Sequence, residues 1–188
     1  MQLGLIIVLI IVVVLMFLVI GVYNRLIKFK VQVQEGASDI DIQLKRRYDL
    51  IPNLIETVKG SAKFEQETLQ QVINARQQAM SVGSEITAEK VAAENQLSGA
   101  LRQLFALSEA YPDLKSNQNY LQLQNELTNT EDRILASRRF YNSVVSDYNS
   151  YQIQFPAVLF RSMAGAKEEK FFELENPEVE RKNVQVKF

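Results

Sequence analysis

The sequence of 188 residues contains no cysteine, no histidine and no tryptophan. Without thiols or imidazoles the chain lacks the usual zinc ligands, histidine- or cysteine-ligated haem, and the Ser–His and Cys–His pairs that activate nucleophiles. The Glu-x-x-His ligands of di-iron helical bundles are excluded in the same way. A lipoprotein anchor is excluded as well, because it needs a cysteine to carry the lipid. We therefore expect no metal site and no cofactor.

Glycine and proline are scarce, with seven and four residues respectively. The glycines are scattered and nowhere form a P-loop or a G-x-G-x-x-G spacing, so no phosphate-binding loop is expected. The net charge of −1 provides no basic footprint for nucleic acid, which we exclude as a partner.

Charge is absent before Arg25, and Leu3–Val22 is an almost unbroken apolar run. As a helix this run is roughly 30 Å long, the thickness of the hydrocarbon core of a bilayer. A cleaved signal peptide is the competing interpretation, but it requires a basic start and a shorter apolar stretch. We therefore predict that residues 1–24 form an uncleaved transmembrane anchor, with the lipid bilayer as a partner.

The residues that follow the run are typical of a membrane interface. Arg25, Lys28 and Lys30 follow the apolar run, whereas no lysine or arginine precedes it. This asymmetry predicts the N-terminus outside and the rest of the chain in the cytoplasm. Tyr23 and Phe29 fit the interfacial aromatic belt. We interpret these five side chains as the interface anchor. The absence of cysteine is compatible with either side of the membrane.

The rest of the sequence predicts an all-α fold. No alternating β-branched runs are bounded by hairpin turns, and prolines such as Pro52, Pro112 and Pro156 separate stretches of helical periodicity. We predict a single N-terminal transmembrane helix that continues into an antiparallel up-down bundle of about four long helices over residues 25–164. Residues 165–188 alternate charged and aromatic side chains and predict an irregular tail.

Helix limits follow from capping residues and from proline. Asp49 is a candidate N-cap of a second helix over Leu50–Ser81, with Pro52 in its first turn. The alternative is a continuous helix with a kink at Pro52. Gly60 costs such a helix about 1 kcal/mol relative to alanine, which predicts close contact with another helix.

Further caps delimit the remaining helices. Thr87 is the expected N-cap of a third helix that ends near Tyr111, and Ser116 that of a fourth and longest helix ending near Gln154. One short helix is expected over residues 157–164.

An apolar stripe continues from the anchor along one face of the first helix. It suits burial in the bundle, and its near-heptad spacing also makes it a candidate seam for self-association with a second copy. The stripe residues are Leu26, Phe29, Val33 and Ile40.

Two kinds of charged group could carry chemistry. Carboxylates on separate helices could meet across the bundle as an acid–base pair, although a solvated helix surface is the simpler interpretation; these are Glu56, Glu65, Glu67, Glu126, Glu131 and Asp132. Two arginine pairs fit salt bridges within the bundle better than a site for an anionic ligand; these are Arg46, Arg47, Arg138 and Arg139.

Two Tyr-Asn doublets, Tyr141-Asn142 and Tyr148-Asn149, stand seven residues apart on one helix face. Buried tyrosines whose hydroxyls find partners inside the bundle are the favoured interpretation. A polar seam that fixes helix register or binds a partner is the alternative.

The segment 39–60, DIDIQLKRRYDLIPNLIETVKG, resembles the signature of the LemA family of bacterial membrane proteins. Residues 111–114 (YPDL), 139–142 (RFYN) and 169–173 (EKFFE) support the resemblance by their order. It implies one N-terminal membrane helix, an antiparallel helical bundle and no established enzymatic activity or catalytic residue. The motif positions have no known role; they are Asp41, Lys45, Arg46, Arg47, Asp49, Pro52, Asn53, Tyr141 and Asn142.

We therefore expect a non-enzymatic scaffold or interaction module of the bacterial inner membrane. We expect it to self-assemble, with a further membrane or cytoplasmic protein as a possible partner. A protein that organises or shapes the bilayer is the first alternative, and a carboxylate enzyme the second. The family resemblance leaves the opposite orientation open, because some relatives carry lipoprotein-type signals that place their bundles outside the cytoplasm.

Overall fold

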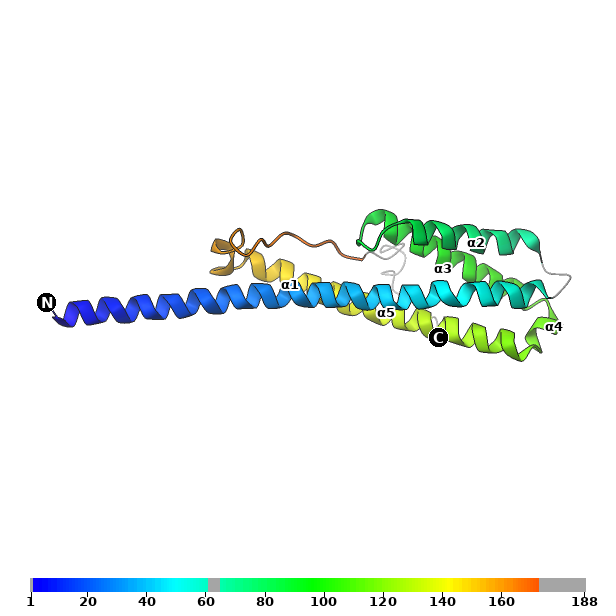
Figure 1. Cartoon of the computed structure of the whole chain (residues 1–188), viewed down its shortest axis with the longest axis horizontal. Coiled ribbons are helices and arrows are strands. Elements are labelled where there is room, and N and C mark those ends of the chain that lie inside the picture. The colour runs from blue at the N-terminus through cyan, green and yellow to red at the C-terminus, as the bar shows by residue number, and fades with distance from the viewer. Residues whose placement is uncertain (1, 61–64, 173–188) are drawn as a thin grey trace, which may run out of the picture. The chain divides into compact units, whose positions relative to one another are not determined.

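A computed structural model describes residues 2–60 and 65–172, and these residues are helical or irregular, with no strand (Figure 1). Four long helices account for most of them, which confirms the predicted all-α bundle with its long N-terminal helix. The helices are α1 (Gln2–Lys59), α2 (Gln66–Ser81), α3 (Ala88–Ser108), α4 (Pro112–Lys115) and α5 (Gln118–Ile153), followed by a 3₁₀ turn (Ala157–Leu159).

The chain divides into two compact units. The membrane-proximal unit comprises residues 1–38 and 139–170, and the bundle unit comprises residues 39–138 together with the chain from Phe171 onward. Helices α1 and α5 each contribute to both units. The predicted limit between anchor and bundle, at residue 24, lies inside α1.

The N-terminal part of α1 is a candidate membrane span by its length and apolar composition. Its apolar side chains are exposed, among them Leu3 at 74% and Phe17 at 66%, and they do not pack into a core of this chain. Lipid is the environment that suits such a surface. The protein is therefore anchored to a membrane through this helix.

Pro52 lies inside α1, so the prediction that Asp49 begins a second helix is wrong and the continuous-helix alternative is right. A proline inside a helix leaves the carbonyl four residues earlier without its N–H donor. Here that carbonyl belongs to Tyr48, and the Nε of Arg76 on α2 donates to it at 2.8 Å. A side chain from another helix thus replaces the missing backbone bond.

The first helix ends instead at Lys59, directly before Gly60. The nearest neighbours of a β-carbon at Gly60 would be carbonyl oxygens of α1 itself, Thr57 at 3.3 Å and Glu56 at 4.0 Å. The predicted close contact with another helix is therefore wrong. The glycine instead follows the last helical residue, a common place for it.

The N-cap of α3 is confirmed: the Thr87 hydroxyl oxygen accepts a hydrogen bond from the Lys90 N–H at 3.1 Å. The cap of α5 is one residue later than predicted. The Asn117 side chain accepts from the N–H groups of Asn119 and Tyr120, whereas Ser116 ends the short helix α4.

Between α5 and residue 172, a three-residue 3₁₀ turn (Ala157–Leu159) forms in place of the predicted helix over 157–164. A turn at Gly165, which adopts a φ of 58°, follows it. Residues 166–172 are irregular, as expected for the tail. The rest of the predicted tail, 173–188, lies outside the described residues.

Candidate functional site

The bundle unit encloses an ionic cluster formed by Arg47, Tyr48, Lys90, Glu94 and Glu131. Helix α1 supplies Arg47 and Tyr48, α3 supplies Lys90 and Glu94 one turn apart, and α5 supplies Glu131. The side chains of Arg47 and Glu94 are completely buried, and Lys90 is 5% exposed. Full burial of an arginine and a glutamate is unusual unless they are paired.

Arg47 makes the central contacts of the ionic cluster. It forms an ion pair with Glu94, and its Nη1 donates to Glu131 at 2.7 Å and to the hydroxyl of Ser98 at 2.9 Å. Arg47 therefore connects α1 to α3 and to α5 at one level of the bundle.

Glu94 accepts from three directions. Besides Arg47, it accepts from the Tyr48 hydroxyl, and the Lys90 ammonium lies 3.3 Å from it. Lys90 also donates to the Tyr48 hydroxyl oxygen at 3.2 Å and to the Ala79 carbonyl at 3.3 Å. Within the cluster two cations, Arg47 and Lys90, accompany two carboxylates, Glu94 and the 34% exposed Glu131.

Burial raises the pKa of Tyr48 far above its ordinary value, and the hydrogen bond to Glu94 raises it further. The hydroxyl therefore stays protonated near neutral pH, where it donates a hydrogen bond and does not act as a general acid. Burial also raises the pKa of Asp41, against the opposing effect of Lys90. Asp41 and Lys90 line a pocket of about 330 Å³ beside the cluster, together with Lys45 and Met80.

The remaining carboxylates are not brought together. Glu126 pairs with Arg46 at 2.6 Å on the surface, and Glu56 lies 3.5 Å from Lys59. Glu65, Glu67 and Asp132 are exposed. Within residues 2–60 and 65–172, no three acidic side chains are grouped so as to hold a metal ion.

The other motif positions divide between surface and interior. Tyr141 is buried, and Asn142 is partly buried and has an interaction partner. Arg139 is exposed, and the guanidinium of Arg138 lies 4.2 Å from the centre of the Phe172 ring. Arg46 is exposed, and so are Lys45, Asp49, Pro52 and Asn53.

In the membrane-proximal unit the Tyr-Asn doublets bind residues 169 and 170 of the irregular segment that follows α5. The Tyr141 hydroxyl donates to the Lys170 carbonyl at 2.8 Å, and burial raises the pKa of Tyr141 to about 12. The Asn149 side chain bonds both backbone groups of Glu169, at 2.8 and 3.0 Å. The favoured interpretation, buried tyrosines with internal partners, is confirmed for Tyr141.

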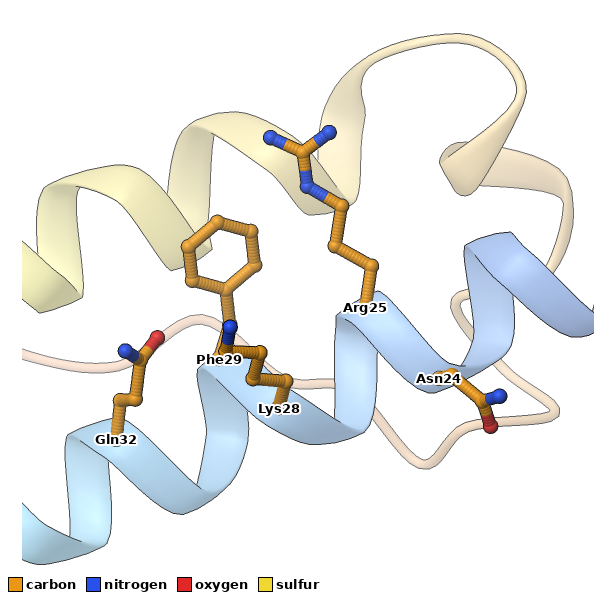
Figure 2. A pocket seen from close by; sticks show the side chains of 5 residues that line it. All are labelled: Asn24, Arg25, Lys28, Phe29 and Gln32. Atoms are coloured by element: carbon orange, nitrogen blue, oxygen red, sulfur yellow. The ribbon is translucent and has the colours of Figure 1, made fainter.

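Three of the five predicted interface residues, Arg25, Lys28 and Phe29, line a shallow pocket of about 570 Å³ together with Asn24 and Gln32 (Figure 2). The Arg25 guanidinium lies 4.6 Å from the ring centre of Tyr151 on α5. That ring packs against Phe29 with centroids 5.4 Å apart. Lys28 also lines the pocket and is exposed.

The remaining interface residues, Tyr23 and Lys30, are 36% exposed and partly buried respectively. The stripe proposed for self-association is largely buried against other residues of the same chain. Leu26, Val33 and Ile40 are 1%, 6% and 1% exposed, and Phe29 packs on Tyr151. These side chains offer no surface to a second copy in this structure.

Sequence reasoning missed Lys90, Glu94 and Ser98, the α3 members of the charged interior. A signal was present, because Glu94 stands three and seven residues before Leu97 and Leu101 on the apolar face of its helix. A carboxylate at such a position needs a cation from a neighbouring helix.

An apolar span continuous with a charge-stabilised helical bundle defines a single-span, membrane-anchored helical-bundle protein. Within this class the chain belongs to the LemA family, whose model matches residues 36–188. It is similar to protein LemA of Metamycoplasma hominis, with 31% identity over 136 residues, 71% of this chain.

Other relatives are the magnetosome protein MamQ 2 of Paramagnetospirillum magneticum and MamQ of Magnetospirillum gryphiswaldense. Each is 23% identical, over 175 and 174 residues and 80% of this chain. The matches cover 61% of the LemA relative and 64% of each MamQ relative, so the chain spans less than two thirds of the length of these proteins.

Proposed function

We propose that the protein acts without chemistry of its own, as a membrane-anchored scaffold that works through contacts between protein chains. The observation that carries the proposal is the ionic cluster. The cluster joins charged side chains of three helices, and two of them, Arg47 and Glu94, are fully buried. We infer that this cluster fixes the register of the three helices that it joins.

The alternative of a carboxylate enzyme gains no support from the contacts of these acids. Glu94 and Glu131 both accept from Arg47, and Glu126 pairs with Arg46. A general acid or base needs a carboxylate that can exchange protons with a substrate. These three carboxylates are engaged with cations of the protein itself.

We further propose that the bundle faces the cytoplasm from the bacterial inner membrane. Arg25, Lys28 and Lys30 lie directly after the span and support this orientation. A cysteine introduced at exposed Ser84, in a chain without other cysteines, tests it. It should react with a membrane-impermeant thiol reagent only after the cells are lysed; reaction in intact cells would reverse the orientation.

Self-association completes the scaffold proposal. It must use surfaces other than the stripe at Leu26 and Ile40, and the exposed apolar span is the largest available. Sedimentation of the detergent-solubilised full chain over a dilution series tests it. We expect particles of more than one chain that persist on dilution, whereas a monodisperse monomer at every concentration would overturn self-association.

A second candidate function is organisation of the bilayer itself. It is favoured by large apolar side chains that lie exposed beyond the span, among them Phe155 at 81% and Leu159 at 64%. Imaging liposomes with and without the reconstituted protein separates the candidates. A scaffold leaves vesicle shape unchanged, whereas a membrane-organising protein deforms or clusters the vesicles.

A further inference from the structure

The end of α5 and the turn after it carry an unusual concentration of exposed apolar side chains. We call residues 153–163 the apolar loop. Five large side chains in it are 43–81% exposed: Ile153, Phe155, Val158, Leu159 and Met163. Contiguous exposed apolar surface of this kind marks a site of interaction with a protein or a membrane.

The position of the apolar loop selects between these two occupants. Ala157 of the loop and the adjacent Ala164 pack with Val22 and Leu26 of α1 in one small core. Val22 is the last residue of the apolar run that forms the span. The loop therefore lies beside α1 where the apolar run of that helix ends (Figure 1).

The orientation of the side chains is inverted relative to a loop in water. The small residue Ala157 is fully buried against α1, whereas Phe155, Leu159 and Met163 point away from the core and are at least 61% exposed. A surface turn in water normally presents polar side chains. Outward-facing large apolar residues beside a membrane helix instead suit the boundary between headgroups and acyl chains.

The charges around the apolar loop complement a lipid surface. Between Asp147 and Glu168 the charged residues are Arg161 and Lys167, both basic. On α1, Arg25 and Lys28 stand at the same end of the span, and Arg25 stacks on Tyr151 just before the loop. Basic residues near the surface attract anionic headgroups.

We propose that the apolar loop inserts into the leaflet from which α1 emerges, as a second membrane contact besides the span. Its apolar side chains enter the interfacial region, and the flanking basic residues lie among the headgroups. The two contacts fix the membrane-proximal unit against the bilayer, where a single span would leave it free to tilt. This inference rests on membrane anchoring and is independent of the scaffold proposal.

The absence of native cysteine allows a clean test by site-directed spin labelling. Single cysteines replace Leu159 and, separately, Met163, both exposed positions where substitution leaves the core intact. Ser146→Cys is the matched control, exposed on α5 in the same unit. The full-length protein is reconstituted into vesicles of phosphatidylethanolamine and phosphatidylglycerol, and collision with oxygen and with a water-soluble nickel chelate is measured.

Oxygen concentrates in the bilayer and the nickel chelate in water. We expect the oxygen-to-nickel accessibility ratio at residues 159 and 163 to exceed that at residue 146 severalfold. Equal ratios at all three positions would overturn the insertion. Labels shielded from both reagents would also overturn it and would indicate a protein partner. Monomeric protein with an embedded loop would refute self-association and leave this inference standing.

Discussion

At Pro52 a side chain replaces a missing backbone hydrogen bond, and this replacement leads to a quantitative prediction. The Nε of Arg76 donates to the Tyr48 carbonyl at 2.8 Å, the carbonyl that Pro52 cannot serve. Arg76→Met keeps the aliphatic stem and removes the donor. A partly buried carbonyl left without a partner costs about 1–3 kcal/mol, and we expect the bundle unit to lose that much stability.

A second substitution distinguishes this mechanism from loss of packing. Pro52→Ala restores an N–H that reaches the Tyr48 carbonyl, so Arg76→Met should cost far less in that background. We expect a coupling free energy of about 1 kcal/mol or more in the double-mutant cycle.

The cycle is measured by urea unfolding of the detergent-solubilised full chain, followed by circular dichroism. Gln77→Met, at the exposed neighbouring position on α2, is the control and should change stability by less than about 0.5 kcal/mol. The same loss for Arg76→Met with and without Pro52 would refute the reasoning.

Three other predictions use the same unfolding assay. Glu94→Gln, inside the ionic cluster, should lower the free energy of unfolding by about 3–5 kcal/mol. Arg46→Met, which breaks an exposed pair, should lower it by less than about 1 kcal/mol. Equal losses for the two variants would contradict the greater structural role assigned to the buried pair. Stability should fall as pH rises from 10 to about 12, because over this window the folded state keeps the Tyr141 proton and the unfolded state loses it. Tyr141→Phe should make that fall less steep, and the part that remains includes the contribution of Tyr48, whose pKa is also raised. Gly36→Val should cost about 1–3 kcal/mol, because a β-carbon there already lies 3.3 Å from the Tyr141 Cα; an unchanged stability would exclude this close approach of α1 and α5.

Local rules predicted the elements whose signals are local. The Thr87 cap is correct because a hydroxyl three residues before an N–H can reach it without help from elsewhere. The apolar span is equally local, since composition alone determines it. Tyr141 was expected to find an internal partner, and it does.

The errors arose where a distant residue overrides a local rule. Proline usually ends or kinks a helix, and the side chain that serves the carbonyl freed by Pro52, Arg76, is far along the chain from Tyr48. Arg47 was expected to form a salt bridge, but its partners on α3 and α5 follow from tertiary packing that periodicity does not specify. A short helix was expected over residues 157–164, where Ala157 and Ala164 instead pack on Val22 and Leu26, a contact that is not visible in the sequence.

In our interpretation Arg47 of the signature pairs with Glu94 and Glu131 inside the bundle, and the protein works through contacts between chains. The most direct test counts subunits of the full-length protein in bilayers by single-molecule photobleaching. Wild type is compared with a variant in which Arg47, Lys90, Glu94 and Glu131 are all methionine. Apolar replacement of a whole buried ionic group is often neutral or stabilising.

We predict the same subunit number, greater than one, for both proteins. A single bleaching step for wild type would contradict self-assembly. A variant that keeps its helical circular dichroism but becomes monomeric would show that these charges act between chains and not within the bundle.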